Sequence, residues 1–166
     1  MSEAQVAFVG LGANLGDAVA TVGAALAALA ALPDTRLLRQ SRLYRSAAWG
    51  VVDQPDFINA VAMLETGQAP AQLLASLLAI ERRFGRDRSL AAVRWGPRIL
   101  DLDLLLYADR VLETAGLTLP HPHLHERAFV LVPLVEIAPD VELPGIGLAR
   151  DAASRLADAG LIPLAP

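Results

Sequence analysis

The order of strand-like and helix-like segments in the first two thirds of the chain restricts the possible folds more than any other feature. Four segments are short and rich in β-forming or alternating apolar residues, and two have apolar residues at helical spacing. The expected strands cover residues 5–10, 36–44, 57–65 and 99–107, and the expected helices cover 18–32, after a cap at Asp17, and 70–85. The second strand segment also fits a helix. The order β-α-β-β-α-β predicts a ferredoxin-like α+β unit, an antiparallel sheet with two helices on one face.

The chain continues beyond this unit without a recognisable linker. We expect residues 86–97 to form a long polar loop, 111–119 to add edge strands, 126–137 to form a helix that Pro133 kinks or breaks, and 151–159 to form a last short helix. No internal repeat or low-complexity segment divides the 166 residues. The sequence therefore predicts a single domain, residues 1–166, with a C-terminal extension.

Composition excludes several classes of protein and of chemistry. With 54% hydrophobic and 19% charged residues the chain is not disordered, and a net charge of −4 argues against a general nucleic-acid binder. Cysteine is absent, which excludes disulfides, thiolate metal ligands and cysteine nucleophiles. All 14 basic residues are arginine, which excludes a Schiff-base lysine and a phosphate-loop lysine. Because no basic leader or long apolar span is evident, we expect a cytoplasmic protein.

Asp101 and Asp103 give the strongest local signal, because they alternate with leucines in a predicted strand. Alternation places both carboxylates on one face, with Cα atoms roughly 6–7 Å apart, and Leu102, Leu104 and Leu106 on the other. Two carboxylates on an apolar strand need a positive partner. A divalent cation such as Mg²⁺ would supply it and take further ligands from phosphate. An arginine partner, or exposure at the strand end, would satisfy the pair equally well.

Arginines are concentrated immediately before the acidic pair. Six of the 14 fall within 17 residues: Arg82, Arg83, Arg86, Arg88, Arg94 and Arg98. Arginine binds phosphate through a bidentate fork, and guanidiniums beside metal-binding carboxylates are typical of phosphoryl transfer. A solvated charged loop, with Arg98 paired to Asp101 or Asp103, would produce the same pattern, so both interpretations stay open.

Two weaker motifs can each be interpreted as structural or as functional. His121, His123 and His125 alternate as zinc ligands can, but prolines interrupt the segment and no fourth ligand is evident. Turn structure, or one histidine near phosphate, is favoured. The glycine-rich segment 10–16 is one residue off the dinucleotide-binding spacing and lacks a βαβ crossover, so a tight turn that fixes Asn14 is favoured.

Aromatic side chains are few, and most are expected in the core. Trp49 and Trp95, however, both fall in predicted loops. A flat heteroaromatic ligand could stack there, with Asn59 recognising its ring nitrogens.

Six segments, in this order, resemble the 6-hydroxymethyl-7,8-dihydropterin pyrophosphokinase family of folate biosynthesis. They are GLGANLGD, LYRSAAWG, QPDFINAV, IERRFGRDR, RWGPRILDLDLLLY and LPHPHLHERAFVLVPLVEIAPD. The likeness covers residues 6–140. It implies a ferredoxin-like fold, ATP as co-substrate with two Mg²⁺ ions, and transfer of the β,γ-pyrophosphoryl group to the pterin hydroxymethyl group with release of AMP.

The resemblance also implies roles for individual residues. Arg86, Arg98, Asp101 and Asp103 would be catalytic, with the two aspartates as the metal ligands. The nucleotide would contact Glu81, Arg88, Arg98, Leu104, Thr118, His121 and Arg127. The pterin would bind among Ser46, Ala47, Trp49, Phe57, Asn59, Trp95 and Phe129, with Phe57 and Phe129 on opposite sides of its ring. The expected partners are these small molecules, with no nucleic acid and no membrane, and the expected state is a monomer.

Some positions depart from the family pattern, and two other function classes remain. Ala47, Leu78 and Gly116 replace residues that are usual in the family, which affects loop dynamics and nucleotide affinity but not the reaction class. A non-catalytic ligand-sensing domain on the same fold would bind pterin without releasing AMP. An oxidoreductase using the glycine-rich segment would be dismissed if Mg-ATP, but not NAD(P), raised the melting temperature.

Overall fold

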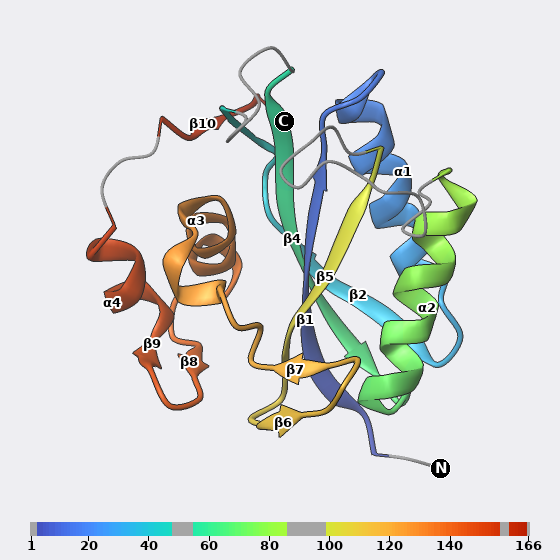
Figure 1. Ribbon diagram of the computed structural model, residues 1–166, viewed down its shortest axis with the longest axis vertical. Coiled ribbons are helices and arrows are strands. Elements are labelled where there is room, and N and C mark those ends of the chain that lie inside the picture. Colours follow the sequence, from blue (N-terminus) through green and yellow to red (C-terminus); the bar gives the residue numbers. More distant parts are fainter. Residues whose placement is uncertain (1–2, 48–54, 86–98, 157–159, 166) are drawn as a thin grey trace.

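The computed structural model describes residues 3–47, 55–85, 99–156 and 160–165, and these form three layers (Figure 1). The middle layer is an antiparallel sheet with the strand order β10-β3-β4-β1-β5, in which β2 also pairs with β4. The strands are β1 (Gln5–Ala13), β2 (Thr35–Gln40), β3 (Tyr44–Ser46), β4 (Phe57–Thr66), β5 (Asp101–Tyr107) and β10 (Ile162–Pro163). Without β10 this is the ferredoxin-like order that the sequence predicts.

Helices α1 (Ala18–Ala30) and α2 (Pro70–Arg83) cover one face of the sheet (Figure 1). In α1 the buried residues follow helical spacing: Val22, Ala25, Leu26 and Leu29. The Asp17 carboxylate accepts a hydrogen bond from the Ala20 backbone N–H at 3.1 Å, which caps α1. Pro70 occupies the first turn of α2, where no intrahelical N–H is needed.

The opposite face is covered by α3 (Ala128–Ile137) and α4 (Ala149–Ser154), with a 3₁₀ turn at Leu124–Glu126 before them (Figure 1). Phe8 and Val61 of the sheet pack here with Leu131 and Leu134 of α3. Helix α3 continues through Pro133, which is buried inside it. None of the helices in the described part of the chain is long and apolar enough to cross a bilayer.

The predicted strand 36–44 is divided into β2 and β3. Gln40 pairs with Ala62 and Tyr44 with Asn59, so three residues on this strand oppose two on β4. The extra residue makes a bulge around Ser41, whose hydroxyl accepts the Val61 N–H at 3.0 Å in place of a backbone carbonyl. The hydroxyl therefore supplies the Val61 N–H of β4 with an acceptor where the backbone hydrogen bonds between the strands are interrupted.

Three further expectations need correction. Residues 111–119 do not extend the main sheet but form a separate hairpin of β6 (Leu112–Glu113) and β7 (Thr118–Leu119). The edge beyond β3 is occupied by β10, which the sequence did not predict. Strand β1 runs on to Ala13, so part of the expected glycine loop is sheet. A second small hairpin, β8 (Glu142–Leu143) and β9 (Gly147–Leu148), precedes α4.

Candidate active site

Asp101 and Asp103 project from β5 toward the α3 face of the sheet, as alternation predicts. Leu102 and Leu104 pack in the core beneath α1 and α2, so the two carboxylates point the other way. Both aspartates are half-buried. The expectation that they share one face is therefore confirmed.

Leu106 lies on the opposite face from the one that strict alternation predicts. It packs in the core under α3, together with Leu105. The register between β1 and β5 shifts, so that Val9 pairs with Leu104 and Phe8 with Leu106. Leu105 is thus an extra residue, which reverses the alternation after Leu104.

Glycines occupy β1 directly beside both carboxylates. Gly12 pairs with Asp101 and Gly10 with Asp103, and on its other side Gly12 pairs with Asn59 of β4. A Cβ at Gly12 would lie 3.4 Å from the Asn59 side-chain oxygen. Because paired residues project on the same face, no side chain stands between Asn59 and Asp101 on β1. This row leaves room for a ligand that spans three strands.

Glu81 holds the beginning of β5 in place. Its side chain is 1% exposed, and its Oε2 accepts the Leu102 backbone N–H at 2.7 Å. Leu102 lies between the two aspartates, so this contact fixes the strand segment that presents them. The predicted role of Glu81 near the nucleotide stays a prediction.

A cavity of about 480 Å³ opens beside β5, between α2 and the β6–β7 hairpin. Its lining includes Asp103 and three of the predicted nucleotide contacts: Leu104, Thr118 and His121. Leu78 and Gly116, two positions that depart from the family pattern, line it as well. The cavity has the size of a small-molecule site, and its lining combines a carboxylate and an imidazole with several leucines.

His121 is a neutral hydrogen-bond donor in this site. The pKa of its imidazole is lowered to about 4, chiefly by burial and also by the nearby Arg127 and His123, while Asp101 opposes them. The His121 Nδ1 accepts the His123 backbone N–H at 3.2 Å. The proton of the neutral ring therefore resides on Nε2. Arg127 lies beside it, with its guanidinium carbon 5.6 Å from the centre of the Phe129 ring.

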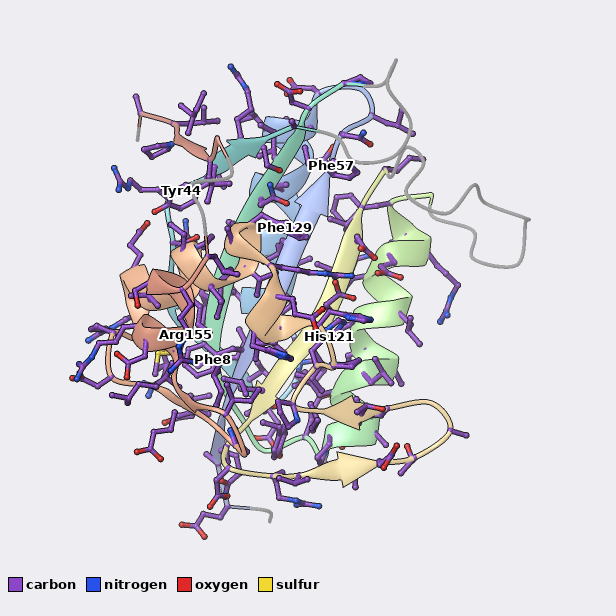
Figure 2. All side chains as sticks on the ribbon, turned by 60° about the vertical axis from the view of Figure 1, so that its left-hand side comes forward. Phe8, Tyr44, Phe57, His121, Phe129 and Arg155 are labelled. Carbon is purple, nitrogen blue, oxygen red and sulfur yellow. The ribbon has the colours of Figure 1, made fainter. Side chains whose placement is uncertain are left out.

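The predicted pterin residues gather at the other end of the row. Asn59 Nδ2 donates to Ser46 Oγ at 2.7 Å, and both side chains are buried. Ser46 pairs with Phe57 across β3 and β4, and Ala47 follows as an exposed residue. In the view of Figure 2, Phe129 lies between Phe57 and His121. The structure thus brings an amide, a hydroxyl and the Phe57 ring to the same end of the sheet, while Phe129 belongs to the helix that covers this face.

Five predicted site residues lie outside the described residues: Trp49, Arg86, Arg88, Trp95 and Arg98. Their roles stay predictions.

The zinc and dinucleotide interpretations gain no support from the structure. Within residues 3–47, 55–85, 99–156 and 160–165 no group of three or more histidine or carboxylate side chains could hold a metal ion. Instead His123 and His125 each contact Glu126, at 3.3 and 3.6 Å. Asn14 is buried, and its amide donates to the Pro55 carbonyl, 41 residues away in the chain, at 3.0 Å.

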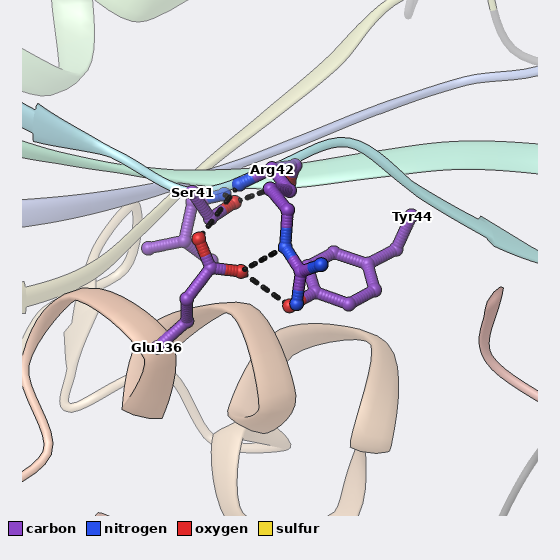
Figure 3. Close-up of polar contacts among 5 residues, drawn as sticks. Ser41, Arg42, Tyr44 and Glu136 are labelled. Atoms are coloured by element: carbon purple, nitrogen blue, oxygen red, sulfur yellow. Dashed lines mark hydrogen bonds and ion pairs between the residues drawn. The ribbon is translucent and has the colours of Figure 1, made fainter. Parts of the chain in front are cut away.

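A polar cluster that no sequence motif indicates links β3 to α3. Glu136, near the end of α3, accepts hydrogen bonds from the Tyr44 hydroxyl and from the Arg42 backbone N–H (Figure 3). These residues are 92 and 94 positions apart from Glu136 in the chain. No local sequence pattern signals a contact at that separation.

A family model and several bacterial proteins with similar sequences carry the description of one enzyme. The family model 7,8-dihydro-6-hydroxymethylpterin-pyrophosphokinase matches residues 8–139. The chain is 49% identical over 140 residues to 2-amino-4-hydroxy-6-hydroxymethyldihydropteridine pyrophosphokinase of Pseudomonas aeruginosa, covering 84% of this chain and 85% of that one. It is 43% identical over 160 residues to the Haemophilus influenzae protein of the same name, covering 96% and 98%.

A solved structure shows the same fold at low identity. The Plasmodium falciparum HPPK-DHPS chain crystallised with pteroate superposes with a TM-score of 0.74 at 12% identity, covering 93% of this chain. The chain spans only 43% of that longer protein. From the family model and the two bacterial relatives, the chain belongs to the 7,8-dihydro-6-hydroxymethylpterin-pyrophosphokinase family.

Proposed function

We propose that this chain transfers the pyrophosphoryl group of ATP to the hydroxymethyl group of 6-hydroxymethyl-7,8-dihydropterin, as a step of folate synthesis. The pterin hydroxyl oxygen forms a bond to the β-phosphorus. The bond from that phosphorus to the α,β-bridging oxygen breaks, AMP leaves, and the hydroxyl proton is released. The observation that carries the proposal is the row from Asn59 through Gly12 to Asp101, which joins an amide suited to a pterin with carboxylates suited to a metal-bound triphosphate.

The acidic pair fits Mg²⁺ by its chemistry and its surroundings. Mg²⁺ prefers oxygen ligands and is usually held by one or two carboxylates together with phosphate. Asp101 and Asp103 offer two carboxylates on one face, half-buried, beside glycines that leave space for phosphates. Two Mg²⁺ ions bound there would neutralise charge on the transferring group.

The cavity beside β5 is proposed to hold the nucleoside part of ATP. Its leucines offer apolar contact to a base, and Thr118 offers a hydroxyl. The neutral His121 would donate from Nε2 to a phosphate oxygen at the end nearest the acidic pair. Arg127 would add a positive charge there, and Arg86, Arg88 and Arg98 are proposed to complete the phosphate contacts.

The pterin is proposed to lie over Asn59 and Ser46. The Asn59 side chain reaches Ser46 with its NH₂ group, which orients the amide and leaves its oxygen directed toward the Gly12 position. A fused ring with adjacent N–H groups can donate to such an oxygen. Phe57 and Phe129 would stack on its faces, with Ala47, Trp49 and Trp95 closing the site.

We further propose that residues 1–166 act as one catalytic domain, as a monomer in the cytoplasm. The three-layer arrangement supports the single domain, since strands from both ends of the chain share one sheet.

The products of one incubation distinguish the possible functions. The chain is mixed with the dihydropterin alcohol and Mg-ATP, and the nucleotides are separated. Pyrophosphoryl transfer yields AMP in equal amount to the pterin diphosphate, whereas transfer of one phosphoryl group would yield ADP. Pterin binding with neither product would contradict the proposal and favour a ligand-sensing domain.

A further inference from the structure

The pterin end of the site has two walls that come from different layers. Strands β3 and β4 form one wall and carry Ser46, Phe57 and Asn59. Helix α3 carries Phe129 in its first turn and forms the other. A ring that is held between the two walls requires them to keep a fixed separation, because a displacement of about 1 Å can cost about 100-fold in rate.

Strand β3 pairs with β4 on one edge and with the two-residue strand β10 on the other. It is three residues long, and the bulge around Ser41 precedes it. The bulge turns the Arg42 backbone N–H away from β4. That N–H donates to Glu136 Oε2 at 2.9 Å (Figure 3).

The other oxygen of Glu136 binds the next inward-facing residue of β3. Glu136 Oε1 accepts a hydrogen bond from the hydroxyl of Tyr44, which is only 4% exposed. The same Oε1 lies 3.5 Å from Arg42 Nε. Burial, together with the hydrogen bond to Glu136, raises the pKa of Tyr44, so this hydroxyl stays a donor. Tyr44 is also the cross-strand partner of Asn59.

We propose that Glu136 is a positioning residue for pterin binding: through Tyr44 and Arg42 it fixes β3 against α3 and so sets the distance between the two walls. This inference rests on the proposed function. Glu136 lies at the opposite end of α3 from Phe129, so it acts through the strand and helix and not by touching the ligand. A carboxylate suits the position, because it accepts two hydrogen bonds at once and pairs with a guanidinium.

The contact is tested by steady-state kinetics on Tyr44→Phe, Glu136→Gln and the double variant. Each variant weakens the hydrogen bonds that join Glu136 to Tyr44 and Arg42, so we expect the pterin KM to rise about 3- to 10-fold. The ATP KM should stay within twofold, and the double variant should resemble Glu136→Gln alone. Glu65→Gln is the matched control, since it removes a carboxylate that pairs with Arg36 at 2.9 Å on the same sheet, at the opposite end of β4 from Phe57 and Asn59; its pterin KM should equal that of the wild type.

Two results would overturn the inference. One is an unchanged pterin KM in both single variants. The other is a parallel rise of both KM values that follows the loss of melting temperature, which indicates a merely structural role. Direct titration of the dihydropterin alcohol, without ATP, separates this test from the proposed function. A wild type that binds pterin but forms no AMP contradicts the function, whereas equal pterin affinity in wild type and variants contradicts the positioning role.

Discussion

Asn59 and Asp101 lie on either side of the same backbone position, since both are cross-strand partners of Gly12. With strands about 4.8 Å apart, their Cα atoms are separated by roughly 10 Å. A pterin recognised at one and a metal-bound triphosphate held at the other would meet over β1. The glycine between them is therefore part of the proposed site, although it contributes no functional group.

A side chain at Gly12 should obstruct this meeting. Gly12→Val places methyl groups against the Asn59 oxygen, which would lie only 3.4 Å from the new Cβ, and we expect AMP formation to fall by roughly tenfold or more. Gly23→Ala is the control, because nothing lies within 4 Å of its Cβ position in α1. That control should retain activity and gain about 0.5–1 kcal/mol of unfolding free energy. Full activity in Gly12→Val would contradict the proposal that the pterin and the triphosphate meet over Gly12.

Removal of the Glu81 carboxylate should loosen the start of β5. Glu81→Ala leaves the Leu102 N–H without this acceptor inside the core, and we expect a loss of about 1–3 kcal/mol in unfolding free energy. Glu81→Gln keeps a carbonyl oxygen and should cost less. Chemical denaturation checks both variants; an equal loss for glutamine and alanine would show that the hydrogen bond is not what stabilises the strand.

Acid should destabilise the protein partly through His121. Its pKa is about 4 in the fold and 6.5 for an ordinary histidine, so the unfolded state binds more protons between these values. Stability is therefore lost as the pH falls from about 6.5 toward 4. Between pH 7.5 and 5, the unfolding free energy should therefore fall by roughly 1 kcal/mol less in His121→Asn than in the wild type. This figure allows for solvent screening of the partly exposed ring. Parallel losses in both proteins would contradict a neutral His121.

The fold could be predicted from sequence where local patterns decide it. Helix α1 has its cap at Asp17 and its apolar spacing, and β5 has alternating aspartates and leucines. The bulge that turns Leu106 to the other face could not be predicted, because it depends on how β5 aligns with β1. Strand β10 was missed because two residues carry almost no pattern, and their pairing with β3 is decided by tertiary contact.

In the site, too, some residues could be predicted from the sequence and others only from the folded structure. Asp101, Asp103, Asn59 and His121 were predicted from chemistry and from family motifs, and the structure places them along one end of the sheet and its adjacent cavity. The role of Gly12 follows only from the strand register. The contact of Glu136 with Tyr44 joins residues 92 positions apart, so it follows only from the packing of α3 on the sheet.

The most direct test of the metal site is AMP formation by Asp101→Asn and Asp103→Asn as the Mg²⁺ concentration is varied, with circular dichroism to check the fold. Asp109→Asn, an exposed aspartate just after β5, is the control. We expect each site variant to lose at least about 100-fold in turnover with its fold intact, while the control retains full activity. Turnover near the wild-type value in both site variants would contradict the central claim that Asp101 and Asp103 together hold the magnesium of the bound ATP.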